Sequence, residues 1–236
     1  MRSLAIIPAR GGSKRIPKKN IKNFSGKPMI AWPIEAAKGA GLFERIIVST
    51  DCDEIAGIAE HYGAEVPFMR PAELADDFTG TEEVVLHALD WLAEHGKLPE
   101  YVCCIYPTAP FLLPEDLIKG AQLIQSGNAP SVLSVCTFSY PVWRAFKQLE
   151  DASLSYQWPE YEHYRSQDLV ELCHDAGQFY WLRKSSFLES KQIVMDGSLP
   201  VFLPRSRVQD IDTLEDWQNA ELMAIAHSSN SIRGDF

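Results

Sequence analysis

Short apolar runs rich in β-branched residues alternate with amphipathic helical patterns along most of this chain of 236 residues. When a strand, a helix and a second strand follow one another, the two strands lie parallel in one sheet and the helix packs on a face. The alternation therefore predicts an α/β fold with a doubly wound, mostly parallel sheet. The predicted strands are Ser3–Pro8, Arg45–Ser49, Glu65–Met69, Tyr101–Tyr106, Ser131–Thr137, Gly177–Leu182 and Val201–Leu203. The predicted helices are Pro28–Ala40, Asp53–Tyr62, Thr81–His95, Pro114–Ser126, Lys184–Lys191 and Thr213–Ala226.

The alternation stops near residue 138, and the segment 138–173 is rich in aromatic and charged residues without a clear period. We predict that this segment leaves the main sheet as an excursion of strands and loops. The core then comprises residues 1–137 and 174–228, and residues 229–236 form a polar tail. A chain of this length suits one such domain with a small appendage.

Charge is distributed unevenly along the chain. The net charge is −10, whereas residues 1–34 contain eight basic residues and no acidic residue. An acidic protein is a poor partner for nucleic acid or for an anionic membrane, so neither partner is expected. The basic segment predicts instead a local site for a small anion. The five cysteines form no C-x-x-C pair and no apolar run reaches 18 residues. A cytoplasmic protein without disulfides, a zinc site or a membrane span is therefore expected.

The basic segment contains a glycine-bearing loop directly after the first predicted strand, with the sequence ARGGSKRIPKKN from Ala9 to Asn20. Adjacent glycines let a backbone come close to a ligand, and basic side chains balance anionic oxygens. Ligands of open α/β sheets bind at the carboxyl ends of strands, so the loop predicts a polyphosphate site, although a solvated basic turn would contain the same residue types. Walker A and G-x-G-x-x-G are both absent. The candidate phosphate-binding residues are Arg10, Gly11, Gly12, Lys14 and Lys19.

Near the other end of the chain, Asp210 and Asp212 follow a predicted strand and lie two residues apart. In an extended segment such residues point to the same face, and paired carboxylates suit a hard cation such as Mg²⁺. The spacing alone is weak, because Asp51 and Asp53 share it and are interpreted as capping residues of the helix that follows them. Asp212 could in the same way cap the last helix.

Together these segments resemble the cytidylyltransferases that activate nonulosonic, sialic-type sugars. The resemblance covers nearly the whole chain and is carried by the blocks IPARGGSKRIPKKN, VSTD, RP, YPTAPF and QDIDT, which start at Ile7, Val48, Arg70, Tyr106 and Gln209. It implies a Rossmann-like fold of the nucleotide-diphospho-sugar transferase type. It also implies transfer of CMP from CTP to the anomeric hydroxyl of a nine-carbon 2-keto sugar acid, with release of pyrophosphate and with Mg²⁺ as the cofactor.

The resemblance also implies roles for individual residues. The basic loop holds the β- and γ-phosphates as charge builds on the leaving group, and Mg²⁺ on Asp210 and Asp212 polarises the α-phosphate. Arg70 matches the residue at the cytosine end, although an Arg-Pro pair is also typical of an exposed turn. The implied nucleotide-binding residues are Arg10, Gly11, Gly12, Ser13, Lys14, Lys19, Asn20 and Arg70, and the implied catalytic residues are Arg10, Lys14, Lys19 and Asp212.

Three blocks in the middle of the chain resemble the branch of the family that activates pseudaminic acid more than the N-acetylneuraminate branch. They are DFTGT, RSQDL and DAGQFYW, which start at Asp77, Arg165 and Asp175. Tyr106 also departs from the sialic acid branch, which usually has Gln there, and an aromatic wall suits a less hydroxylated, methyl-bearing sugar. The expected sugar-binding residues are Tyr106, Arg165, Gln167, Asp175 and Gln178, with Arg165 facing the sugar carboxylate. Without the resemblance, Arg165 is interpreted as part of a surface ion pair.

In this family, the segment that corresponds to 138–173 mediates a dimer and approaches the partner's site, so a homodimer is expected. The aromatic residues of this segment, among them Trp143 and Trp158, fit an interface. A lid over the chain's own pocket would explain them as well.

Three other functions stay open at the level of the sequence. The sugar could be N-acetylneuraminate or legionaminate. A glycosyltransferase also combines an α/β sheet with a D-x-D metal pair, but that pair normally lies near the middle of the chain and the glycine-bearing loop would have no role. A non-catalytic CTP-binding domain would bind the nucleotide without turnover.

Overall fold

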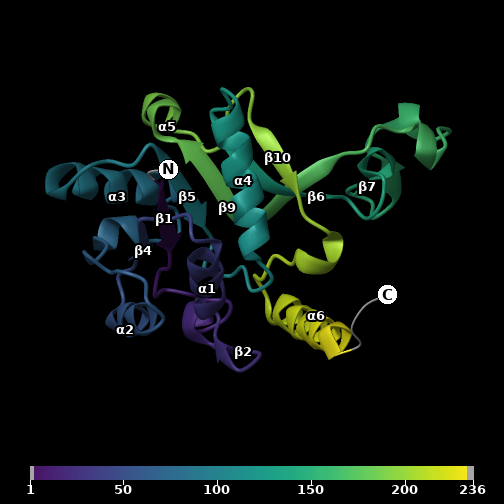
Figure 1. The fold of residues 1–236 in the computed structure, drawn as a ribbon. Coiled ribbons are helices and arrows are strands. Elements are labelled where there is room, and N and C mark those ends of the chain that lie inside the picture. Colours follow the sequence, from purple (N-terminus) through teal and green to yellow (C-terminus); the bar gives the residue numbers. More distant parts are fainter. Residues whose placement is uncertain (1–2, 233–236) are drawn as a thin grey trace.

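A six-stranded sheet forms the centre of the computed structural model, which describes residues 3–232 and the side chains of residues 3–229 (Figure 1). The strands lie in the order β10-β6-β9-β5-β1-β4. Strand β9 runs antiparallel to both of its neighbours and the other pairs are parallel, so the sheet is mostly parallel, as predicted. The strands are β1 Ser3–Pro8, β4 Arg45–Ser49, β5 Tyr101–Ile105, β6 Ser131–Thr137, β9 Cys173–Arg183 and β10 Leu199–Phe202.

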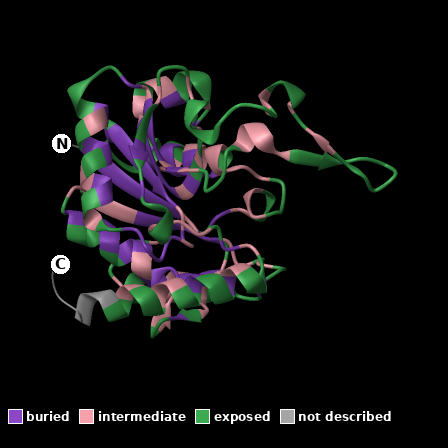
Figure 2. Cartoon of the chain, turned by 90° about the vertical axis from the view of Figure 1, so that its right-hand side faces the viewer, coloured by how far each residue is buried: buried purple, intermediate pink, exposed green. Residues whose placement is uncertain are grey.

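Helices cover both faces of the sheet, as a doubly wound fold requires. Along β1, Ala5 and Ile7 pack in a cluster with α1, α2 and α4, whereas Leu4 and Ile6 pack in a second cluster with α3 and α5. Successive side chains of a strand point to opposite faces, so one apolar run supplies both layers. Figure 2 shows the buried strands between these layers. The helices are α1 Ala31–Ala40, α2 Asp53–His61, α3 Thr81–His95, α4 Pro114–Ser126 and α5 Lys184–Ser190.

The prediction of a strand at Glu65–Met69 is wrong. Glu65 and Met69 form only isolated bridges, to Ile47 and to Thr50, on the outer side of β4. Pro67 lies between them in the sequence and has no N–H to donate. A continuous ladder therefore cannot form at this edge of the sheet.

Two other boundaries lie three or four residues from the predicted ones. Helix α1 begins at Ala31 rather than at Pro28, because β3 Lys27–Pro28 pairs with β2 Asn23–Phe24 in a small antiparallel hairpin. Strand β9 begins at Cys173 rather than at Gly177, because its first residues pair with the end of β6. Short 3-10 helices occupy Lys19–Ile21, Ala72–Leu74, Val142–Arg144, Pro159–Tyr161, Ser166–Asp168 and Arg205–Arg207.

The last helix, α6, spans Leu214–Ile232 and continues past Ala226, its predicted end. Thr213 and Asp216 form a capping box at its start: the Thr213 N–H donates to the Asp216 carboxylate over 2.8 Å, and the Asp216 N–H donates to the Thr213 hydroxyl over 3.2 Å. Residues 229–232 are thus helical, and the expected tail is wrong for them. Residues 233–236 of that tail lie outside the described residues.

Residues 138–172 leave the sheet between β6 and β9 and project from the main body (Figure 2). They contain a two-stranded antiparallel sheet, β7 Phe146–Gln148 and β8 Leu154–Tyr156. The ring of Trp143 contacts the rings of Trp158 and Tyr161. Large apolar side chains remain exposed on this projection, namely Phe138, Tyr140, Phe146, Leu149, Leu154, Tyr164 and Val170.

Gly120 of α4 lies directly against β9. A Cβ atom at this position would come within 2.6 Å of Trp181 Cδ1 and 3.0 Å of Phe179 Cε2. Both rings are fully buried, so they have little room to move. We predict that Gly120→Ala lowers the free energy of unfolding by about 1–3 kcal/mol, despite the better helix propensity of alanine.

Urea denaturation measures this change. Gly57→Ala in α2 is the matched control, because a Cβ there meets no atom within 4 Å. This control should gain about 0.5–1 kcal/mol of stability. If Gly120→Ala proves as stable as the control, the close packing of α4 on β9 is contradicted.

Candidate active site

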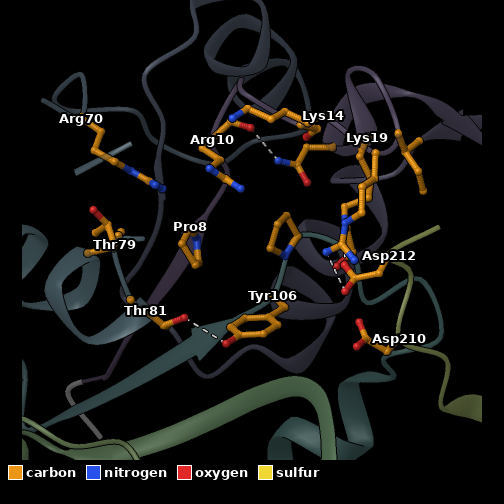
Figure 3. Close-up of a pocket in the computed structure, with 18 residues that line it drawn as sticks. Pro8, Arg10, Lys14, Lys19, Arg70, Thr79, Thr81, Tyr106, Asp210 and Asp212 are labelled. Atoms are coloured by element: carbon orange, nitrogen blue, oxygen red, sulfur yellow. Dashed lines mark hydrogen bonds and ion pairs between the residues drawn. The ribbon is translucent and has the colours of Figure 1, made fainter. Parts of the chain in front are cut away.

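A pocket of about 330 Å³ opens at the carboxyl ends of β1 and β5 (Figure 3). Ligands of open α/β sheets bind at this edge. The walls come mainly from the loop after β1, the turn before α3, the loop after β5 and the segment before α6. The lining residues are Pro8, Arg10, Ser13, Lys14, Arg15, Ile16, Lys19, Asn20, Arg70, Thr79, Gly80, Thr81, Val84, Tyr106, Pro107, Thr108, Asp210 and Asp212.

The basic loop after β1 forms one wall of this pocket. Figure 3 shows Arg10, Lys14 and Lys19 along it. The buried side chain of Asn20 donates from Nδ2 to the carbonyl oxygen of Arg10 over 2.9 Å and so holds the loop in shape. Several basic side chains on one concave wall create a positive potential that favours an anionic ligand.

Asp77 lies against two of these basic side chains. Its carboxylate accepts a hydrogen bond from Arg10 over 2.7 Å and also pairs with Lys14. The contact with Lys14, followed by that with Arg10, holds the pKa of Asp77 below its usual range. Arg10 also donates to the carbonyl oxygen of Asp76 over 2.6 Å. The basic loop thus already binds an anionic group from the turn before α3.

Asp210 and Asp212 lie in the segment opposite the basic loop (Figure 3). Arg15 approaches the Asp212 carboxylate to 2.8 Å, and Lys19 lies 3.3 Å from it. Lys19 also donates to the carbonyl oxygen of Ile211 over 2.5 Å. The structure therefore brings the basic loop and the aspartate pair, some 193 positions apart in the sequence, into one pocket.

The interpretation of Asp212 as a cap of α6 is wrong. Thr213 and Asp216 cap the helix instead, and the Asp216 carboxylate also accepts the backbone N–H of Asp212 over 3.1 Å. Asp212 is held by its backbone at the start of the helix. Its carboxylate is therefore left to contact Arg15 and Lys19 at the pocket.

The aspartate pair fits a divalent cation. Burial, together with the nearby charge of Asp212, raises the pKa of Asp210, and a bound cation would relieve both effects. Mg²⁺ takes oxygen ligands, often one or two carboxylates completed by water and phosphate oxygens. Within residues 3–232 no cluster of three or more His, Cys, Asp or Glu side chains could hold a metal ion. The donor set therefore suits a cation that arrives with a polyphosphate.

Arg70 and the turn before α3 form the far end of the pocket. The side chain of Arg70 is buried; its Nε donates to the hydroxyl of Ser49 over 3.1 Å, and its guanidinium also donates to the carbonyl oxygen of Ser49. Burial lowers the pKa of Arg70 to about 10, so it keeps its charge at neutral pH. The alternative of an exposed turn is wrong for Arg70. Thr79 and Thr81 add hydroxyl groups at the same end.

Tyr106 lies between Thr81 and Asp210 on the pocket wall (Figure 3). Its hydroxyl forms a hydrogen bond of 2.9 Å with the hydroxyl of Thr81, and its ring meets the ring of Tyr180 edge to face. Burial raises the pKa of Tyr106. Thr81 takes up one hydrogen bond of the hydroxyl, and the ring of Tyr106 adds an apolar surface to the wall.

Six of the predicted residues do not line this pocket: Gly11, Gly12, Arg165, Gln167, Asp175 and Gln178. Arg165 forms a bidentate ion pair with Asp168 at the surface of the projecting segment, where Gln167 is also exposed. Gln178 is buried and donates from Nε2 to the carbonyl oxygen of Arg207 over 2.6 Å. These contacts are with protein groups outside the pocket.

Gly11 and Asp175 also bind protein groups. A Cβ at Gly11 would lie 3.0 Å from Cys52 Cβ, so this glycine permits the close approach of the basic loop to the segment after β4. The Asp175 carboxylate accepts hydrogen bonds from the hydroxyl of Tyr180 over 2.6 Å and from the N–H of Gly177 over 2.8 Å.

Four lining residues with polar side chains were not predicted from the sequence: Arg15, Thr79, Thr81 and Thr108. Arg15 follows Lys14 in the basic loop, and this position was a usable signal. The threonines could not be predicted in this way, because threonine is common before helices and in loops whether or not it contacts a ligand. Only the folded chain brings them to the pocket.

A doubly wound sheet that holds a basic loop and a carboxylate pair around one pocket at its strand ends defines a nucleotide-binding enzyme of the nucleotidyltransferase class. The chain belongs to the cytidylyltransferase family, because the family model described as "Cytidylyltransferase" matches residues 4–194. The resemblance drawn from the sequence is thereby confirmed.

Several relatives match over nearly the full length of the chain. A pseudaminic acid cytidylyltransferase of Campylobacter jejuni subsp. jejuni serotype O:2 is 42% identical over 226 residues, which cover 94% of this chain and 96% of the relative. A CMP-N,N'-diacetyllegionaminic acid synthase of Legionella pneumophila is 36% identical over 233 residues, with 94% and 95% covered. Among solved structures, a CMP:2-keto-3-deoxy-manno-octonic acid synthetase complexed with CTP shares the fold with a TM-score of 0.70 at 14% identity, covering 96% of this chain and 100% of that chain.

The contacts of Asp77 generate a prediction about anion binding. Asp77→Asn removes the carboxylate that pairs with Arg10 and Lys14, so pyrophosphate no longer competes with it. An exposed ion pair contributes up to about 1 kcal/mol, so we expect pyrophosphate to bind about three- to fivefold more tightly at low salt. Isothermal titration calorimetry measures this affinity.

Glu73→Gln is the control for Asp77→Asn, because Glu73 is exposed in the same connection and has no ion pair among the described contacts. Its affinity for pyrophosphate should equal that of the parent. The difference between the two variants should shrink at high ionic strength. Weaker binding by Asp77→Asn would show instead that Asp77 holds the basic loop in its binding shape.

Proposed function

We propose that this protein transfers CMP from CTP to the anomeric hydroxyl of pseudaminic acid and releases pyrophosphate. The observation that carries the proposal is the meeting of the basic loop and the aspartate pair in one pocket. The name of the 42% identical relative adds the identity of the sugar. The first observation comes from the geometry of the pocket, and the second from the similarity of the sequence.

In the proposed reaction, the anomeric oxygen of the sugar attacks the α-phosphorus of CTP. The new bond joins that oxygen to the phosphorus, the bond from the α-phosphorus to the bridging oxygen breaks, and the hydroxyl proton leaves to solvent or to a base. Such reactions depend mainly on positioning and on charge stabilisation. Arg10, Lys14 and Lys19 would bind the β- and γ-phosphates and stabilise the leaving pyrophosphate.

The other end of the pocket would bind the nucleoside. Arg70 and Ser13 would contact it, with hydroxyl groups from Thr79 and Thr81 nearby. Asp210 and Asp212 would hold Mg²⁺, which when bound polarises an oxygen of the α-phosphate. Asn20 would act through its hydrogen bond to the carbonyl oxygen of Arg10, which keeps the loop in place.

The sugar would lie against Tyr106. An apolar ring suits pseudaminic acid better than a more hydroxylated sugar, because a buried hydroxyl group without a partner is costly. The predicted sugar contacts of Arg165, Gln167, Asp175 and Gln178 stay proposals, although none of these residues lines the pocket of this chain. Arg165 and Gln167 would need to reach the pocket of a partner chain.

We also propose a homodimer formed through the segment 138–173. Its exposed apolar side chains, such as Tyr140, Leu154 and Val170, support an interface. A cytoplasmic location is proposed as well, and it fits five cysteines that are all unpaired. No helix within residues 3–232 combines the length and apolar character needed to cross a membrane.

A panel of sugars tests the proposed substrate. Purified protein with CTP and Mg²⁺ should release pyrophosphate with pseudaminic acid, and more slowly with legionaminate or N-acetylneuraminate. Faster turnover of N-acetylneuraminate would contradict the choice of sugar. Consumption of a nucleotide-sugar in place of CTP would indicate a glycosyltransferase.

Asp212→Asn tests the proposed role of the aspartate pair. The amide keeps the shape of the side chain but loses its charge, so kcat should fall about a hundredfold or more. Asp196→Asn is the control, because Asp196 is exposed and does not line the pocket. The temperature of thermal unfolding should stay unchanged in both variants. Full activity of Asp212→Asn would exclude Asp212 as an essential metal ligand.

Lys14→Ala tests the phosphate end of the pocket. The loss of one charge-assisted contact should raise KM for CTP by about tenfold and leave KM for the sugar nearly unchanged. Lys119→Ala on α4 is the control, since Lys119 is exposed and lies outside the pocket. Equal effects of Lys14→Ala on both substrates would contradict a role restricted to phosphate.

A further inference from the structure

The segment between β10 and α6 carries Asp210 and Asp212 into the pocket, although it contains no strand. From Pro204 onward its backbone–backbone hydrogen bonds are short-range turns, such as those that join Arg207 to Pro204 and Val208 to Arg205. A connection of this kind is free to move unless other parts of the protein hold it. Its position therefore depends on side chains.

Arg207 provides such a contact just before the aspartate pair. Its guanidinium donates to both carboxylate oxygens of Asp116, over 2.5 and 3.0 Å, and to the carbonyl oxygen of Phe111 over 3.2 Å. Asp116 is buried in the first turn of α4, where it also accepts the N–H of Leu113 over 3.1 Å. A bidentate arginine–carboxylate pair fixes orientation as well as distance.

Gln178 holds Arg207 from the other side. Its side chain is 3% exposed and donates to the backbone carbonyl oxygen of Arg207 over 2.6 Å. Gln178 is itself fixed at an irregularity in the pairing of β6 with β9, where its N–H donates to the hydroxyl of Ser134 over 3.3 Å. Both the side chain and the backbone of Arg207 are thus attached to the core.

Ile211, between the two aspartates, is held as well, and its carbonyl oxygen accepts a hydrogen bond from Lys19. Ile211 is 1% exposed and packs in a cluster with Trp217 of α6. In an extended segment, the side chains before and after it point the opposite way, toward the pocket. The segment is thus held just before the pair by Arg207 and within it by Ile211.

We infer that Arg207, held by Asp116 and Gln178, is a positioning residue that determines where the carboxylates of Asp210 and Asp212 lie in the pocket. The inference rests on the proposed function only in treating these carboxylates as metal ligands. It gives Gln178 a role that does not depend on the proposed contact with the sugar. It also links the metal site to the first turn of α4.

Arg207→Gln tests the inference, with Arg183→Gln as the matched control. Arg183 is the last residue of β9 and lies outside the segment that carries the aspartate pair. Like Arg207, it donates to carbonyl oxygens, namely those of Ile124, Gly127 and Ala129. Both variants should lose stability, because each removes a partly buried charged donor. Only Arg207→Gln should move the aspartate pair.

Two measurements compare these variants. Hydrogen exchange of the backbone amides of residues 208–213 should become at least about tenfold faster in Arg207→Gln and stay unchanged in Arg183→Gln. Binding of Mn²⁺, followed by electron paramagnetic resonance, should weaken about tenfold in Arg207→Gln only. Arg207→Lys keeps the charge opposite Asp116 and should recover part of both losses.

A double variant tests the pairing itself. Asp116→Asn with Arg207→Gln should weaken Mn²⁺ binding no more than either single change, because both remove the same contact. If Arg207→Gln does not fold, Arg207→Lys and Asp116→Asn provide the same comparisons. Additive losses in the double variant would overturn the assignment of Asp116 as the partner through which Arg207 acts.

The outcomes separate this inference from the proposed function. If residues 208–213 of Arg207→Gln exchange their amide hydrogens at the parent's rate, and the variant binds Mn²⁺ with the parent's affinity, the inference is overturned. This holds whatever reaction the enzyme catalyses. If Asp210→Ala and Asp212→Ala still bind Mn²⁺ with the parent's affinity, the proposed metal site fails. The exchange of residues 208–213 then decides alone whether Arg207 positions this segment.

Discussion

The contact between the basic loop and the segment before α6 is the interaction on which the site depends. Lys19 holds the carbonyl oxygen of Ile211, and Arg15 and Lys19 pair with Asp212. Neither segment could form the pocket alone, because one supplies the positive charge and the other the carboxylates. The apolar cluster of Ile211 and Trp217 also contains Ile16 of the basic loop, and this packing strengthens the contact between the two segments.

Local patterns predicted the layers of the fold well, because apolar runs and helix signals act over a few residues. The strand expected at Glu65–Met69 failed for a local reason, since Pro67 lacks a donor. The basic loop and Asp212 could be chosen from charge, spacing and a family resemblance. Their contact could not, because it requires segments from both ends of the chain to meet.

Residues whose role depends on distant partners were placed least well from the sequence. Arg70 next to Pro71 has the pattern of a surface turn, yet its side chain is buried and donates to Ser49 at the end of β4. Gln178 lies in a block similar to that of sugar-activating relatives, yet its side chain holds Arg207. In each case, packing between segments far apart in the sequence determines what the side chain contacts.

The direction of β9 determines how the projecting segment 138–172 joins the sheet. Because β9 is antiparallel to β6, Thr137 at the end of one strand pairs with Cys173 at the start of the other. Residues 138–172 therefore leave and rejoin the sheet at a single point. Insertions, deletions or exchanges in this segment would leave the register of the sheet untouched, so the projection can change in length and sequence while the strand ends that carry the pocket are inherited unchanged.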